Sequence, residues 1–142
     1  MAAHFEDGGI RFRYPENWKL EREENEAGWT VSVQSPDTAF IMVCFRDDEA
    51  TPDEMARAAL DALKEEYPEL ESEESVDSVG GQPATGYDVR FFSLDLSNTC
   101  FLRSFYSSEG TVLVLWQAND LELERIEPVL RAICTSFEVN ED

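Results

Sequence analysis

Two segments of the chain contain apolar residues that follow one another almost without interruption, residues 112–116 and residues 39–45. A β-strand turns successive side chains to opposite faces, so an unbroken apolar run needs cover on both faces. We therefore predict that both segments are interior strands of a sheet. Residues 111–118 are the predicted centre of that sheet, with a helix on each side.

Other segments alternate apolar and polar residues, which is typical of half-buried strands. This pattern predicts strands over residues 10–14, 29–33 and 87–91, with a further strand starting at Trp18 and Leu20. Residues 100–106 run back from a turn toward the central strand, which indicates an antiparallel meander. The strongly acidic residues 69–77 form either an edge strand, whose charges block pairing with other molecules, or a loop.

A helix is predicted to begin after Thr51. Thr51 and Glu54 have the spacing of a capping box, and Pro52 occupies the first helical position, where a missing N–H costs little. Apolar residues then recur at helical spacing as far as Tyr67. Pro68 ends the helix because the residue before a proline is displaced from the helical region.

A second helix is predicted to begin near Asn119, with Glu122 as its capping partner. Its buried face is marked by residues at alternating spacings of three and four: Leu123, Ile126, Leu130, Ile133 and Phe137. Pro128 lies within this pattern and removes one backbone hydrogen bond. We therefore expect a kink or a break near residues 124–127.

These elements predict a single domain over residues 1–142, of the α+β class. The expected architecture is a three-layer α/β/α sandwich, with a mainly antiparallel sheet of about seven strands. Because two strands are apolar on both faces, the two helices should cover opposite sides of the sheet. A chain of 142 residues can bury roughly 70% of its unfolded surface, which suffices for a core without metals or disulfides.

The chain is strongly acidic, with 31 acidic residues, 11 basic residues and a net charge of −20. This charge argues against nucleic acid and against anionic membranes as partners, since both require basic surfaces. The acidity is explained by solubility, by a basic protein partner or by salt adaptation. No apolar run approaches the roughly 18 residues of a membrane span, so no membrane insertion is expected.

The cysteines and the amino end favour a cytoplasmic location. Cys44, Cys100 and Cys134 form no CxxC pair and are expected to be buried, reduced thiols. The first residues lack the basic and apolar regions of a signal peptide.

The sequence offers little material for catalysis. The one histidine, His4, lies near an end that we expect to be mobile, and no GxSxG, HExxH, GxGxxG or Gly-Lys-Ser/Thr motif occurs. The acids at 47–49, with Asp53 and Glu54, lack the spacing and the glycine of a calcium loop. We predict no catalytic residues, no metal site and no cofactor.

Several short motifs resemble PsbP-like domains. They are residues 12–18 (Phe-Arg-Tyr-Pro-Glu-Asn-Trp), residues 31–37, residues 51–54 at the start of the first helix, and Ser136-Phe137 at the end of the chain. The resemblance implies a three-layer α/β/α sandwich around an antiparallel sheet. Members of this family share a fold rather than a reaction, so it implies no catalytic residue.

We therefore expect a non-enzymatic accessory or adaptor domain that binds another protein through an acidic or exposed apolar surface. The candidate protein-binding residues are acids on either side of the first predicted helix: Asp47, Asp48, Glu49, Glu65, Glu66 and Glu69. The alternative is an enzyme or small-ligand-binding protein with a pocket of aromatic and carboxylate side chains. The identity of the partner and the oligomeric state stay open.

Overall fold

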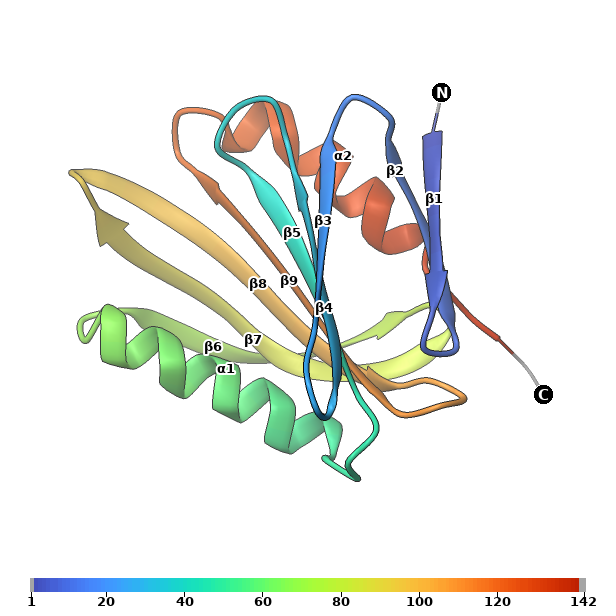
Figure 1. Cartoon of the computed structure of the whole chain (residues 1–142). Helices are drawn as coiled ribbons and strands as arrows, with labels where there is room; N and C mark the ends of the chain where they lie inside the picture. Colours follow the sequence, from blue (N-terminus) through green and yellow to red (C-terminus); the bar gives the residue numbers. More distant parts are fainter. Residues whose placement is uncertain (1, 141–142) are drawn as a thin grey trace.

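The computed structural model describes residues 2–140 as ten strands and two helices (Figure 1). In chain order the elements are β1 (Ala2–Asp7), β2 (Ile10–Pro15), β3 (Lys19–Glu24), β4 (Gly28–Gln34), β5 (Phe40–Arg46), α1 (Pro52–Glu66), β6 (Glu71–Val79), β7 (Gln82–Ser93), β8 (Leu96–Tyr106), β9 (Thr111–Asn119), α2 (Leu123–Thr135) and β10 (Glu138–Val139).

Seven strands form one antiparallel sheet in the order β3-β4-β5-β9-β8-β7-β6. The two doubly apolar strands, β5 and β9, are interior strands of this sheet, as predicted, and they lie next to each other near its middle. The α1 and α2 helices lie on opposite sides of this sheet (Figure 1). The predicted α/β/α layering and the predicted number of strands in the main sheet are therefore confirmed.

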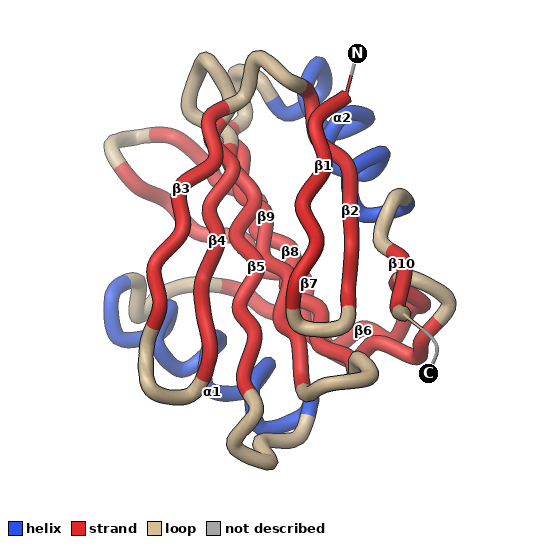
Figure 2. Tube along the Cα trace, turned by 45° about the vertical axis from the view of Figure 1, so that its right-hand side comes forward, coloured by secondary structure: helices blue, strands red, loops and turns tan. Residues whose placement is uncertain are grey.

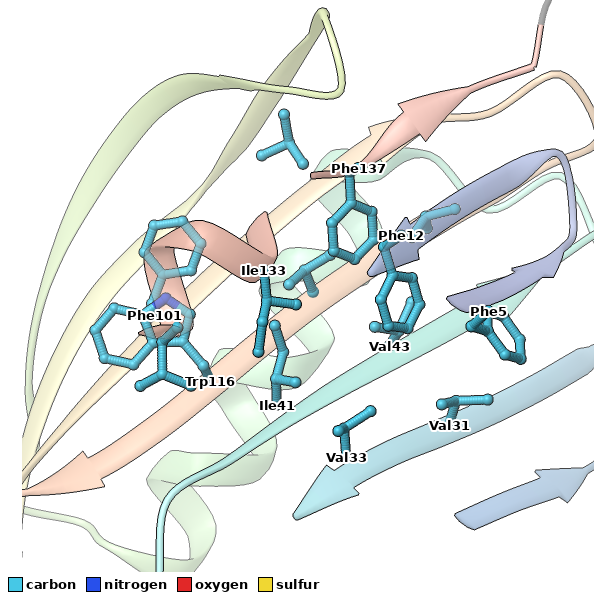
Figure 3. Close-up of a cluster of buried hydrophobic side chains, with 14 of the residues drawn as sticks. Phe5, Phe12, Val31, Val33, Ile41, Val43, Phe101, Trp116, Ile133 and Phe137 are labelled. Carbon is cyan, nitrogen blue, oxygen red and sulfur yellow. The ribbon is translucent and has the colours of Figure 1, made fainter. Parts of the chain in front are cut away.

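The alternation of side chains along β9 separates two cores. Val112, Val114 and Trp116 belong to the larger core on the α2 side, whereas Leu115 belongs to a smaller core beneath α1. Figure 3 shows the larger core as a continuous cluster, with Phe5 at one end and Phe101 and Trp116 at the other. One strand thus supplies the floor of both cores.

The start of α1 agrees with its sequence signal. The hydroxyl of Thr51 accepts a hydrogen bond from the Glu54 N–H at 3.1 Å, and the Glu54 carboxylate accepts one from the Thr51 N–H at 3.1 Å. Pro52 is the first helical residue. The helix ends at Glu66, before Tyr67 and Pro68, as expected.

The predicted start of α2 was wrong. Asn119 is the last residue of β9, and the helix begins at Leu123. Glu122 is the residue at the N-cap position, but its side chain makes no capping hydrogen bond and its carboxylate accepts one from the Thr38 hydroxyl instead. The expected break is also absent, since α2 is continuous across Pro128. The missing proline N–H affects only the carbonyl of Glu124, an exposed residue that water can solvate.

A second sheet of three strands, in the order β1-β2-β10, was not predicted (Figure 2). The segment around His4, which we expected to be mobile, is strand β1. The predicted strand at residues 10–14 is β2, and it belongs to this small sheet because a turn at Pro15 directs the chain away. In this turn the backbone N–H of Trp18 donates a hydrogen bond to the Pro15 carbonyl at 3.0 Å. The Trp18 side chain is buried, as expected from the sequence.

Within residues 2–140, no helix is both long and apolar enough to cross a membrane. The three cysteines are free thiols, with Cys100 buried and Cys44 and Cys134 half-buried. Burial raises the pKa of Cys100 to about 12 and that of Cys134 to about 12.

Candidate protein-binding site at the tip of the β7–β8 hairpin

The β7–β8 hairpin ends in an exposed apolar tip. Phe92 is 78% exposed and Leu94 is 93% exposed, and both are large side chains that would normally be buried. Leu94 and Asp95 form the two-residue turn between the paired residues Ser93 and Leu96. The tip projects from one end of the main sheet (Figure 1).

The backbone of this turn is strained. Leu94 has a φ of 53° and Asp95 has a φ of 63°, in the left-handed region that residues with a side chain rarely adopt. The two other two-residue hairpin turns, β1–β2 and β6–β7, have the same positive φ at both positions, but each is built from a glycine pair. Turns of this kind favour Gly, Asn and Asp, so leucine is the exception. Strain of this kind is concentrated at functional sites.

A small cleft lies beside the tip, between the end of α1 and the end of β7. Its volume is about 360 Å³, and its lining residues are Glu66, Tyr67, Pro68, Glu69, Leu70, Phe91 and Phe92. The rings of Tyr67 and Phe91 stack with centroids 4.0 Å apart and form a rigid apolar wall. A cleft of this size suits one large side chain of a partner.

The turn between β9 and α2 extends the apolar surface at this end of the sheet. Asp120 donates a backbone hydrogen bond to the Ser97 carbonyl at 2.9 Å, which holds the turn beside the start of β8. The next residue, Leu121, is 81% exposed. We define the hairpin-end site as the following set: Glu66, Tyr67, Glu69, Leu70, Phe91, Phe92, Leu94, Asp95, Asp120 and Leu121.

The charges of the hairpin-end site are acidic. Its apolar residues are accompanied by the carboxylates of Glu66, Glu69, Asp95 and Asp120. Arg90, two residues before Phe92, is a nearby exposed cation on β7. Exposed apolar side chains accompanied by carboxylates complement a partner that combines apolar anchors with basic residues.

The six acids predicted to bind protein fall into two separate groups. Asp47, Asp48 and Glu49 precede α1, whereas Glu65, Glu66 and Glu69 lie at its other end. The helix has 15 residues and is therefore about 22 Å long. All six side chains are exposed, but only Glu66 and Glu69 line the cleft at the hairpin-end site.

The group before α1 is partly neutralised. Asp48 forms an ion pair with Arg46, and the hydrogen bond from that guanidinium holds the pKa of Asp48 below its usual value. Within residues 2–140, no three histidine, cysteine or carboxylate side chains come close enough to hold a metal ion.

A larger cleft lies elsewhere, between α2, the β6–β7 hairpin and the C-terminal segment. Its volume is about 710 Å³. Phe101 and Trp116 stack with centroids 5.4 Å apart in its floor, and Arg131 of α2 lies 6.0 Å from the Trp116 ring. These residues give the cleft both apolar and cationic character.

The single histidine is not arranged for nucleophilic catalysis. His4 and Ser136 line the same small cleft. The Ser136 hydroxyl, however, donates to the Ile133 carbonyl at 2.6 Å and accepts from the Arg13 N–H at 2.9 Å. These backbone contacts occupy the hydroxyl, so it forms no pair with His4.

Sequence reasoning missed Phe92, Leu94 and Leu121, although the first two leave a signal. Tyr87, Val89 and Phe91 alternate with polar residues, and Phe92 places an aromatic side chain on the polar side of that alternation. Leu94 then stands where a tight turn calls for Gly or Asn. Two large apolar residues at positions that favour polar or small ones predict an exposed apolar tip.

The sequence matches no protein-family model and no curated protein. Its fold is similar to that of cyanobacterial PsbP (CyanoP) from Synechocystis sp. PCC 6803, with a TM-score of 0.61, 10% identity, and coverage of 97% of this chain and 92% of that chain. It is also similar to LpqN of Mycobacterium tuberculosis, a protein involved in cell envelope biogenesis, with a TM-score of 0.59, 16% identity and coverage of 99% and 90%.

A third similar structure is a protein from Bacteroides thetaiotaomicron, with a TM-score of 0.65 and 12% identity. The similarity covers 98% of this chain and 48% of that one. At such identities the likeness concerns the fold alone. The chain therefore has the PsbP-like α+β fold, and the resemblance noted in the sequence is confirmed at this level.

Proposed function

We propose that the chain is a non-enzymatic accessory domain that binds a basic protein through the hairpin-end site. The observation that carries this proposal is the turn at Leu94 and Asp95, where a nearly fully exposed leucine adopts a backbone conformation suited to glycine. Folding gains nothing from this choice, whereas a partner gains an apolar anchor. Binding would offset the strain by burying the leucine.

The acidity of the chain supports a basic partner. The net charge of −20 accelerates encounter with positively charged proteins and opposes association between copies of the chain. The acids at the hairpin-end site then select the orientation in which the partner's basic residues surround its apolar anchor.

Affinity capture with immobilised protein tests the proposal. The variant Phe92→Ser removes an apolar side chain that is 78% exposed, and the matched control Tyr106→Ser removes one that is 54% exposed at the other end of β8. We expect the wild type and the control to retain the same protein, and Phe92→Ser to lose it. Retention should weaken as salt is raised, because screening shortens the reach of the charges. Equal capture by both variants, or capture insensitive to salt, would refute the proposal.

The alternative function is small-ligand binding in the cleft of about 710 Å³ beside α2. Its volume falls in the range of ligand pockets, and stacked aromatic rings with a cation are typical linings. A ligand there should shift the fluorescence of Trp116, and the shift should disappear in Trp116→Phe but persist in Trp18→Phe. A ligand screen that leaves both the fluorescence and the thermal stability unchanged argues against this alternative.

A further inference from the structure

Strand β6 is an open edge of the main sheet. It is the last strand in the order, pairs only with β7 and has seven exposed residues among its nine. In an antiparallel ladder, every second residue of an edge strand directs its N–H and C=O groups away from its neighbour. No backbone hydrogen bond within residues 2–140 uses these outward groups of β6. The acids of β6 oppose pairing with acidic strands, but the outward backbone groups form a template for a strand of opposite charge.

The opposite edge, β3, differs in length and charge. It has six residues, and its acids are accompanied by Lys19 and Arg22, which form ion pairs with Glu21 and Glu24. Strand β6 carries four acids and no basic residue. The two edges therefore present similar backbone groups but very different electrostatic potentials.

Most of the charge on β6 is uncompensated. Asp77 is paired with Arg103 at 2.7 Å, and the same guanidinium holds Asp88 at 3.0 Å. Glu71, Glu73 and Glu74 form no ion pair within residues 2–140, and only Glu71 has a cation, Arg90, directly opposite it on β7. Glu73 also stands directly opposite Asp88 on β7, and like charges at that position are destabilising.

We propose that β6 accepts an extended, basic segment of a partner protein as an eighth strand of the sheet. The backbone of the segment would pair with the outward groups of β6, which is strand addition. Basic side chains on one face would meet Glu71 and Glu73, and those on the other face would meet Glu74, because side chains alternate. A second copy of this chain is a poor occupant, since it would bring four more acids to the same edge.

This inference rests on the proposed function only in taking a protein as the partner. The two surfaces are adjacent, because Leu70 lines the cleft of the hairpin-end site and immediately precedes β6. A strand that pairs along β6 can therefore continue into that cleft. The backbone pairing itself does not depend on Phe92 or Leu94.

Hydrogen exchange with a peptide probe tests the proposal. The probe is a capped ten-residue peptide of alternating Lys and Val, and the controls are the same peptide with Glu in place of Lys and one with Pro in place of Val. We expect the Lys-Val peptide to slow exchange of the outward β6 amides at least tenfold and to leave β3 unchanged. The Glu-Val and Lys-Pro peptides should protect neither edge, because one carries the wrong charge and the other lacks every second N–H.

Charge variants complete the test. The triple variant Glu71→Gln, Glu73→Gln, Glu74→Gln should weaken peptide binding about tenfold at low salt, since exposed ion pairs are individually weak. The control Glu21→Gln, Glu23→Gln, Glu24→Gln on β3 should bind as the wild type does, and so should Tyr106→Ser, which lies outside both surfaces. The proposal is overturned by binding without β6 protection, by equal protection of β3, by binding of the Lys-Pro peptide, or by β6 protection that rises with protein concentration alone.

Discussion

Replacing Leu94 by Asn and Asp95 by Gly should stabilise the protein while abolishing its binding to a partner. Both native residues have positive φ angles, and a left-handed conformation costs a non-glycine residue about 1–2 kcal/mol. Leu94 is 93% exposed, so its removal forfeits almost no packing. Because Asp tolerates this region better than Leu, we expect a total gain of about 1–2 kcal/mol in the free energy of unfolding.

Urea and thermal unfolding followed by circular dichroism measure this gain. The urea midpoint should rise without a change in slope, and the melting temperature should rise by about 3–8 °C for a domain of this size. The β6–β7 turn supplies a control in the reverse direction. Gly81 has a φ of 79°, and a Cβ added there would meet no atom within 4 Å, so Gly81→Ala should cost about 1 kcal/mol through the backbone alone.

Two outcomes would contradict the reasoning. A Leu94→Asn, Asp95→Gly variant that is no more stable than the wild type would mean that the turn stores no strain. A stabilised variant that still captures the partner of the wild type would mean that the leucine serves another purpose. A gain in stability with a loss of capture is the expected trade between the two.

Three further predictions concern the framework. Arg103→Met should destabilise the fold by about 2–3 kcal/mol, because the Arg103 side chain is only 3% exposed and donates hydrogen bonds to two carboxylates and two backbone carbonyls. The control Arg131→Met, at an exposed position, should cost less than about 0.5 kcal/mol. Urea unfolding compares the free energies of the two variants. Thr51→Ala should cost about 1 kcal/mol in the same assay, since it removes a capping hydrogen bond, and an unchanged midpoint would contradict this. Cys100 and Cys134 have a pKa of about 12 in the fold, above the ordinary value of 9.0. Their contribution to stability is therefore complete below pH 9 and lost as the pH rises toward 12, so alkaline urea titrations should show falling midpoints, and thiol reagents at pH 8 should label the two slowly until the protein unfolds.

The parts of the fold that the sequence predicts well are those where one local signal dominates. The unbroken apolar run in β9 demanded cover on both faces, and the Thr51–Glu54 spacing determined where α1 begins. The parts that failed depend on distant contacts. The Thr38 hydroxyl binds the Glu122 carboxylate, which therefore does not cap α2, and the Phe5 ring packs against Trp29 of β4 only once the chain has folded.

The candidate site was predicted only in part, for a similar reason. The prediction from clustered acids included Glu66 and Glu69, which do line the cleft. It also included Asp47 and Glu49, which lie at the other end of α1, a helix about 22 Å long. Exposure of Phe92 depends on α2 covering only part of its face of the sheet. The sequence of β7 alone does not predict how much of the sheet α2 will cover.

Because β9 contributes to both cores, it also limits where this chain tolerates insertions and deletions. Deleting a single residue within residues 112–116 would exchange the two faces of the strand downstream of the change, so that Trp116 would point toward α1 into space shaped for Leu115. Lengthening the β3–β4 turn at residues 25–27, two of which are exposed, would disturb neither interior. Length variation among natural variants of this domain should therefore be tolerated in such turns and be nearly absent from β9.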